Sequence, residues 1–357
     1  MRANFWINLT LLVFLNGALP TYGQTEKVVW EASSSGKTVS FRGVCAISAQ
    51  ACWVSGTKGI VLRTTDAGKT WESVGPANCE SLDFRDIEAW DELTAVIMSS
   101  GEEDRIYRTE DGGKTWSLVF EHPNRAAFFD GFAFADTNTG WLMGDPIDGQ
   151  LLILKTIDGG RTWTELPRER LPAIEAGEAG FAASGTNIAA ISSDSFAIAL
   201  GGAKPGDEFE RSRIVSTKDD GVSWTVQIVP LRRSEAGGIF SICRLSTDSW
   251  AAVGGNYKQA DVTSQTAALT RDGGISWKSV NASSPSGYRS CVAAGLDSSE
   301  NPILITVGPN GTDTSRDQGE TWQRAADEGF HALDFSPDRK AGWAAGSDGR
   351  IARWRGE

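Results

Sequence analysis

The chain is 357 residues long, enough for one large repeat domain, and it is rich in glycine (40) and tryptophan (14). Its formal net charge of −12 repels nucleic acid and anionic membrane surfaces, so we expect no nucleic-acid partner. The only two histidines, His122 and His331, exclude a His-rich metal site, and we expect no metal and no other cofactor.

The first 23 residues have the pattern of a signal peptide. Arg2 forms a short basic region, residues 7–19 are mostly apolar, and a small residue, Gly23, stands at the expected cleavage edge. The apolar stretch is too short to span a bilayer comfortably. We therefore expect an exported protein, periplasmic or secreted, whose mature chain is a single domain over residues 24–357 with no transmembrane segment.

An odd number of cysteines leaves at least one free thiol or an intermolecular pair. The five are Cys45, Cys52, Cys79, Cys243 and Cys291. Cys45 and Cys52 fall on consecutive predicted strands, where they could pair. The pairing stays open at this point because geometry decides it.

One eight-residue phrase recurs six times. In each copy an Asp is followed by Gly two positions later, by Thr or Ser four positions later, and then by Trp; the Asp residues stand 45 to 61 residues apart. An Asp-Gly turn between apolar runs is typical of a β-hairpin connection, and the Trp supplies a ring to pack between sheets. Turn chemistry accounts for all four residues, so we assign a structural role to the box residues Asp66, Asp111, Asp158, Asp219, Asp272 and Asp317.

The copies, for example TEDGGKTW at 109–116 and TIDGGRTW at 156–163, resemble Asp-box (BNR) repeats. Such repeats are found in sialidases, sortilin-like receptors, some glycan hydrolases and photosystem II stability/assembly-factor-like propellers. The six copies span residues 64–322, so the resemblance covers nearly all of the predicted mature chain. It implies an all-β fold, a β-propeller, and it does not imply one reaction.

Aligning the copies predicts four strands per repeat, with the box turn between the third and the fourth. In the first repeat these strands are 41–47, 52–55, 60–64 and 71–74. Further repeats cover about 82–120, 126–167, 181–230, 236–280 and 287–324. A seventh repeat has no box and only three strands, at 331–335, 342–345 and 350–354. Residues 28–32 resemble the strand that follows a box, so we predict a seven-bladed propeller whose last blade is closed by the N-terminal strand.

The second strand of most repeats carries a large aromatic residue. The residues concerned are Trp53, Trp141, Phe196, Trp250 and Trp343. Their repetition in what the alignment gives as one register favours a core between blades over a carbohydrate-binding platform.

The first residues of the innermost strands define the candidate site. We align Phe41-Arg42, Phe84-Arg85, Phe129-Asp130, Gly185-Thr186, Gly237-Gly238, Tyr288-Arg289 and Phe330-His331. Equivalent positions of a propeller form a ring around its axis, so Arg42, Arg85, Arg289 and His331 should converge at the mouth of the channel, with Asp130 opposite. Guanidinium groups gathered there suit a carboxylate, sulfate or phosphate group. Pairing with local acids is the structural alternative.

Long loops share the face of the propeller at which the innermost strands begin, which we call the funnel face. They are the charged segment 201–212, the segment 254–264 with Tyr257, the segment 144–150 with Asp145, and the connection 167–185. Long loops on a rigid scaffold usually carry function. The candidate ligand-binding residues are therefore Arg42, Arg85, Asp130, Asp145, Tyr257, Tyr288, Arg289 and His331.

Among Asp-box proteins, the chain is most similar to the exported bacterial photosystem II assembly-factor-like propellers, because of its predicted blades, its boxes and its Phe-Arg pairs. The resemblance implies a non-catalytic scaffold that binds a protein, or an anionic small molecule or glycan, at the funnel face, in the assembly of a membrane-associated complex. We expect a monomer.

The alternative is a sialidase-like glycoside hydrolase, in which the three arginines would mimic the family's Arg triad. The resemblance would then give catalytic roles to Tyr288, Glu178 and Asp130. The Arg-Ile-Pro motif of sialidases is absent, since Gly43 follows Arg42. Tyr288 and Arg289 are also adjacent, so on a strand they would point to opposite faces. A binding function is favoured and the hydrolase remains open.

Overall fold

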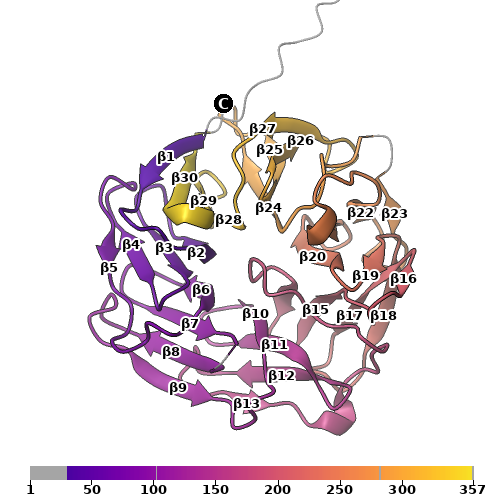
Figure 1. The fold of residues 1–357 in the computed structure, drawn as a ribbon, viewed down its shortest axis with the longest axis horizontal. Coiled ribbons are helices and arrows are strands. Elements are labelled where there is room, and N and C mark those ends of the chain that lie inside the picture. The colour runs from indigo at the N-terminus through magenta and orange to yellow at the C-terminus, as the bar shows by residue number, and fades with distance from the viewer. Residues whose placement is uncertain (1–29, 102, 281–282, 356–357) are drawn as a thin grey trace, which may run out of the picture.

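The computed structural model describes residues 30–101, 103–280 and 283–355, which form a closed ring of seven antiparallel sheets around a central axis (Figure 1). The all-β, seven-bladed propeller is therefore confirmed. The predicted signal peptide, residues 1–23, lies outside the described residues. Within the described part, no helix is long and apolar enough to cross a bilayer.

The blades follow one another in chain order, and within each blade the strands run from the axis to the rim. Blade one contains β2 (Phe41–Ala46), β3 (Cys52–Gly56), β4 (Val61–Thr64) and β5 (Glu72–Ser73). Blade two contains β6 (Phe84–Ala89), β7 (Ala95–Ser99), β8 (Arg105–Thr109) and β9 (Ser117–Glu121). Blade three contains β10 (Phe129–Phe134), β11 (Gly140–Ile147), β12 (Gln150–Thr156) and β13 (Thr164–Glu165).

Blade four contains β14 (Ile188–Ser192), β15 (Ser195–Leu200), β17 (Ser212–Thr217) and β18 (Thr225–Val229). Blade five contains β20 (Gly237–Arg244), β21 (Trp250–Asn256), β22 (Ala267–Thr270) and β23 (Lys278–Ser279), extended by β16 (Glu208–Phe209) and β19 (Arg233–Ser234). Blade six contains β24 (Cys291–Leu296), β25 (Pro302–Gly308), β26 (Gly311–Ser315) and β27 (Gln323–Ala326). Short 3₁₀ helices occur at Arg168–Arg170, Tyr257–Gln259 and Ser347–Gly349.

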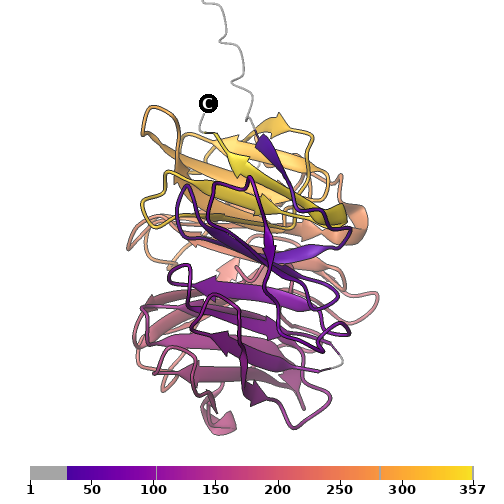
Figure 2. The same cartoon turned by 90° about the vertical axis from the view of Figure 1, so that its left-hand side faces the viewer.

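The seventh blade is built from both ends of the described chain. It contains β28 (Ala332–Phe335), β29 (Gly342–Ala345), β30 (Arg350–Trp354) and, as its outer strand, β1 (Trp30–Ser34). β1 pairs antiparallel with β30, with Trp30 opposite Trp354 (Figures 1 and 2). The Trp30 ring also packs at 5.1 Å from the Phe330 ring. The predicted closure by the N-terminal strand is confirmed.

Each Asp box is a self-contained turn. In the first box, Asp66 Oδ1 accepts from Thr64 Oγ1 and from Thr70 N (both 2.9 Å), while Oδ2 accepts from Thr70 Oγ1 (2.7 Å). The same bonds recur in the other five boxes, with Ser315 acting for Thr64 in the sixth. These bonds satisfy the backbone of the turn, which explains why Asp recurs there.

The strand aromatics are all buried, but they do not share one register. Trp53 and Trp141 pair with Arg63 and Lys155, one residue before the first Thr of each box, and they face the next blade together with Trp343. Phe196 and Trp250 instead pair with the box residues Thr217 and Thr270, and they face the preceding blade. Successive side chains of a strand alternate between faces, so a shift of one residue reverses the direction.

All five cysteines are free. Cys52 stands opposite Ala46, not opposite Cys45, in the β2–β3 ladder. Cys45 therefore packs toward blade two and Cys52 toward blade seven, which prevents the disulfide that their sequence spacing allows.

Candidate functional site

In the first three blades, a β-bulge at the start of the innermost strand directs one side chain into the funnel. The pairing register skips a residue between Phe41 and Gly43, between Phe84 and Asp86, and between Phe129 and Gly131. The aromatic residue before each bulge is fully buried, and the bulged residue is Arg42, Arg85 or Asp130. In blade seven Phe330 and His331 take the same places, because Phe330 N donates to blade six as Phe41 N donates to blade seven. Bulges commonly re-aim a side chain in this way.

The predicted convergence of Arg289 with the other arginines is wrong, because blade six is shifted by one residue. Arg289 N donates to Gly254 O of the preceding blade (3.0 Å), which is the bond that Phe41 N makes with Gly346 O (3.0 Å). Arg289 thus occupies the buried aromatic position and Ser290 the bulge position. Its guanidinium, fully buried, is bound inside blade six by Asp313, Asn310, Ser286 and the Tyr288 carbonyl.

Blade five is shifted in the same direction by two residues, so the ring position there belongs to Phe240 and not to Gly238. The register skips between Ile239 and Ser241. Phe240 stacks on Phe181 with ring centroids 3.9 Å apart and packs edge-on against Tyr288 at 4.7 Å. Tyr257 contacts all three rings and is 49% exposed. We call Phe181, Phe240, Tyr257 and Tyr288 the aromatic cluster.

The connection before blade four crosses the axis as a plug. Residues 181–186 contact blade two through the Arg85–Ala182 carbonyl bond (3.1 Å) and blade six through Ser184 Oγ, which donates to Ser290 O (2.8 Å). Thr186 accepts from Ile242 N of blade five (2.9 Å). The axial plug, as we call residues 181–186, separates the funnel from a cavity below it and was signalled only by the length of the connection 167–185.

The basic residues of the ring lie close together on one arc. Burial and the neighbouring Arg85 lower the pKa of Arg42, and Arg42 makes no hydrogen bond or ion pair with the described residues. Arg85 is paired with Asp83 (2.9 Å) and lies 5.3 Å from the centre of the Phe128 ring. Burial and the charges of Arg42, Arg350 and Arg85 lower the pKa of His331 to about 4, so His331 is neutral at pH 7. Arg42 is therefore the unpaired cation of this arc.

Asp130 faces a second acid and makes no ion pair with a cation of the described residues. Its side chain is 1% exposed, and the carboxyl of Asp145, near the end of β11, lies beside it. Burial and Asp145 raise the pKa of Asp130, and burial raises that of Asp145 to about 6. The two predicted site residues, Asp130 and Asp145, are thus brought together, and the charge of Arg85 acts on Asp130 in the opposite sense, lowering its pKa.

The residues proposed for a sialidase-like hydrolase do not form one site. Glu178 has a fully buried side chain held by Arg213 and by Arg233 (2.9 Å), and Glu175 joins the same network. Burial raises the pKa of the Tyr288 hydroxyl, and the ring is 4% exposed, so it is not a ready nucleophile. With Arg289 also bound within its blade, the roles implied for Glu178, Tyr288 and an Arg triad have no common site.

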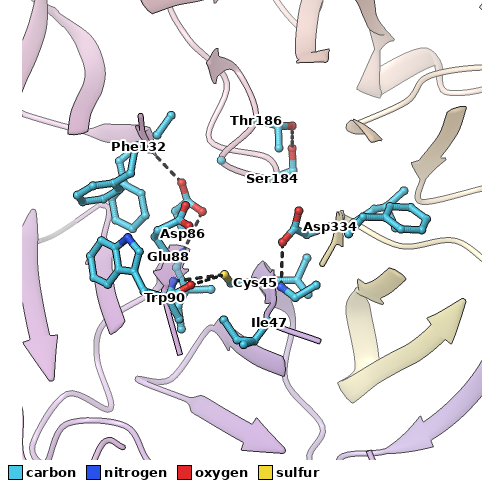
Figure 3. A pocket seen from close by; sticks show the side chains of 18 of the residues that line it. Cys45, Ile47, Asp86, Glu88, Trp90, Phe132, Ser184, Thr186 and Asp334 are labelled. Carbon is cyan, nitrogen blue, oxygen red and sulfur yellow. Dashed lines mark hydrogen bonds between the residues drawn. The ribbon is translucent and has the colours of Figure 1, made fainter. Parts of the chain in front are cut away.

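Below the axial plug lies an acidic cavity of about 400 Å³. Asp86, Glu88 and Asp334 present their carboxyls to it, across from Ser184 and Thr186 (Figure 3). Burial raises the pKa of Asp86 and of Glu88 to about 8 and that of Asp334 to about 6. The described residues nevertheless group no three His, Cys, Asp or Glu side chains suited to holding a metal ion.

The fold and the site define a class: an Asp-box, seven-bladed propeller with a plugged axis and a basic, aromatic funnel face. The family model described as photosynthesis system II assembly factor YCF48 matches residues 28–127. The resemblance seen in the sequence is therefore confirmed over the first two blades. Among curated proteins, none matches the sequence significantly.

Solved structures with the same fold include two YCF48 propellers. One, described as YCF48 bound to D1 peptide, is 17% identical, with 94% of this chain and 99% of that chain covered and a TM-score of 0.61. YCF48 from Cyanidioschyzon merolae is 16% identical, with 91% and 98% covered and a TM-score of 0.61. The GH74 xyloglucanase from Xanthomonas campestris is 15% identical, with 91% and 53% covered and a TM-score of 0.59. At these identities the likeness establishes the fold alone.

Proposed function

We propose that this protein is an exported, non-catalytic scaffold that holds a segment of a partner protein at its funnel face during assembly of a membrane-associated complex. The observation that carries the proposal is Arg42, a largely buried guanidinium without a partner among the described residues, at the mouth of the funnel. The match to the YCF48 family model and the similar YCF48 structure with a bound D1 peptide support a polypeptide as the ligand.

The chemistry of the funnel suits a segment with one carboxylate and one apolar side chain. Arg42 and Arg85 repel each other, and an anion between them would relieve that repulsion through charge-assisted hydrogen bonds. Arg85 is already paired with Asp83, so Arg42 is the principal anchor. Tyr257, half exposed at the edge of the aromatic cluster, offers an adjacent apolar contact.

Short peptides that contain an aromatic residue, each made with a free C-terminal carboxylate and as the C-terminal amide, test the proposal by fluorescence anisotropy. We expect Arg42→Ala to weaken binding of the best carboxylate peptide by about tenfold or more and to reduce its salt dependence. Arg42→Lys should be a poor replacement if the contact is bidentate.

A matched control is Arg161→Ala, which removes an exposed arginine of the third box, far from the funnel. This variant should bind as the parent does. A folded Arg42→Ala, Arg85→Ala double variant that binds the peptides as tightly as the parent would contradict the proposed site.

A further inference from the structure

A second cavity lies on the opposite face of the propeller, between blades four and five. Its volume is about 340 Å³, at the lower end of the ~300–1,000 Å³ typical of ligand pockets. It opens beside the fifth box turn and the turn between β20 and β21. Its walls include Ala197, Ser216, Trp250, Trp277 and Ile275.

The cavity occurs where the chain lacks a ring that it places elsewhere. Trp53, Trp141 and Trp343 each fill the interface with the next blade. The pairing register puts Ala197 of β15 at that position in blade four, because Ala197 pairs with Ser216, one residue before the box residue Thr217. A small residue at a position that holds an indole in blades one, three and seven leaves the space open.

The interface between blades three and four shows how a ring would sit. There Trp141 stacks on Phe196 with centroids 4.7 Å apart and an interplanar angle of 26°, and Phe196 packs edge-on against the box residue Trp224 (5.4 Å). In the next interface, Trp250 stands at the place of Phe196 and Trp277 at the place of Trp224. Both aromatic walls are therefore present around the cavity, and only the ring between them is missing.

Polar partners for such a ring are also present. In two filled interfaces the indole Nε1 donates to a carbonyl in the turn of the next blade, from Trp53 to Asp91 O and from Trp343 to Ser48 O (both 3.1 Å). Ser246 occupies the equivalent place in blade five, since its N–H bonds Ser249 O as that of Ser48 bonds Ala51 O. Arg244 lines the cavity, and its guanidinium can face a ring as that of Arg63 faces Trp53 at 5.5 Å.

We propose that this cavity receives an aromatic side chain of indole size from a partner polypeptide. The mouth favours a polypeptide over a free ring, because Ile275 beside it is 89% exposed and extends the apolar contact beyond the cavity. The surface lies on the box face, so this site is independent of the one proposed at the funnel. Two faces would then allow the scaffold to contact two polypeptide segments at once.

Binding of two probes tests the proposal: free indole and the capped tripeptide acetyl-Gly-Trp-Gly-amide, titrated against the full chain with calorimetry and protein-observed NMR. We expect one site per chain, with the tripeptide binding at least as tightly as indole. Ala197→Trp should abolish binding of both probes, because it supplies the missing ring internally. Binding of free indole with exclusion of the tripeptide would overturn the polypeptide as the occupant.

Ile275→Ser keeps the test decisive if Ala197→Trp fails to fold. It should weaken tripeptide binding by severalfold, whereas Val222→Ser should not. Val222 is the matched control, since it holds the same place in the fourth box, is 64% exposed, and stands two residues before Trp224, which packs in the interface that Trp141 fills. A folded Ala197→Trp variant that binds either probe like the parent, or equal effects of the two Ser variants, would overturn the proposal.

Discussion

At the scale of single residues, the box carboxylates act entirely within their own turns. Asp111 accepts from Thr109 Oγ1, from Thr115 N and from Thr115 Oγ1, at 2.9, 2.9 and 2.6 Å. The bonds from Thr115 lower the pKa of Asp111 to about 2, and those from Thr70 do the same for Asp66. An ionised box carboxylate is therefore bound more favourably in the folded state than in the unfolded chain.

We predict that Asp111→Ala lowers the melting temperature by a few degrees near pH 7 without changing ligand binding at the funnel. The folded pKa of about 2 lies below the ordinary value of ~3.9, so the stabilisation is present above pH ~4 and is lost as the pH falls toward 2. The difference in melting temperature between variant and parent should accordingly shrink between pH 4 and 2. A variant of normal stability that loses peptide binding would contradict the structural role.

Single residues also mark where sequence reasoning stopped. Arg42 and Arg85 were found because a Phe-Arg pair starts two strands alike, whereas the Tyr288-Arg289 pair looks the same and stands one residue out of register. The glycines at 237 and 238 hid Phe240 in the same way. The register is fixed by the bulges and by the hydrogen bonds to the neighbouring blade, and those bonds join residues far apart in the chain.

At the scale of elements, the strands followed from the repeated box, and the closing strand followed from its likeness to a strand after a box. The axial plug and the pairing of β16 with β19 could not be predicted, because irregular segments are positioned by contacts distant in sequence. The candidate site depends on the plug, which brings Phe181 to the aromatic cluster. The fold was thus more predictable than the site.

We predict that deleting residues 24–34 lowers the melting temperature by roughly 10 °C or more. The deletion removes β1, exposes the edge of β30 and uncovers the Trp354 ring, which packs at 5.8 Å from Trp30. Losing such contacts costs about 3–5 kcal/mol, and ~1 kcal/mol corresponds to ~2–4 °C in a large domain. Glu31→Ala, which keeps the strand, serves as the control in differential scanning calorimetry. An unchanged melting temperature after the deletion would refute closure by β1.

At the scale of the whole molecule, the ring of blades gathers charges of one sign on each side of the axial plug. The funnel carries Arg42 and Arg85 above the plug, and the cavity carries Asp86, Glu88 and Asp334 below it. The three acids come from blades two and seven and are held apart from the arginines, so they cannot neutralise them. They lower their charge by retaining protons, which is what their raised pKa values express.

This arrangement makes the stability of the whole ring depend on pH. Asp86 and Glu88 have pKa values of about 8 in the folded protein, while acids in an unfolded chain ionise near pH ~4. Between these values the folded state holds protons that the unfolded state has lost, so stability decreases as the pH rises from 4 to 8 and levels off above 8.

The melting temperature should therefore fall between pH 5 and 8.5. Glu88→Gln should flatten part of that fall, because a neutral amide has no proton to lose. Glu92→Gln, on an exposed turn of the same blade, is the matched control and should leave the profile unchanged. A melting temperature that stays level or rises with pH in the parent, followed by calorimetry in buffers of equal ionic strength, would show that the carboxyls of the axial cavity are ionised in the folded ring.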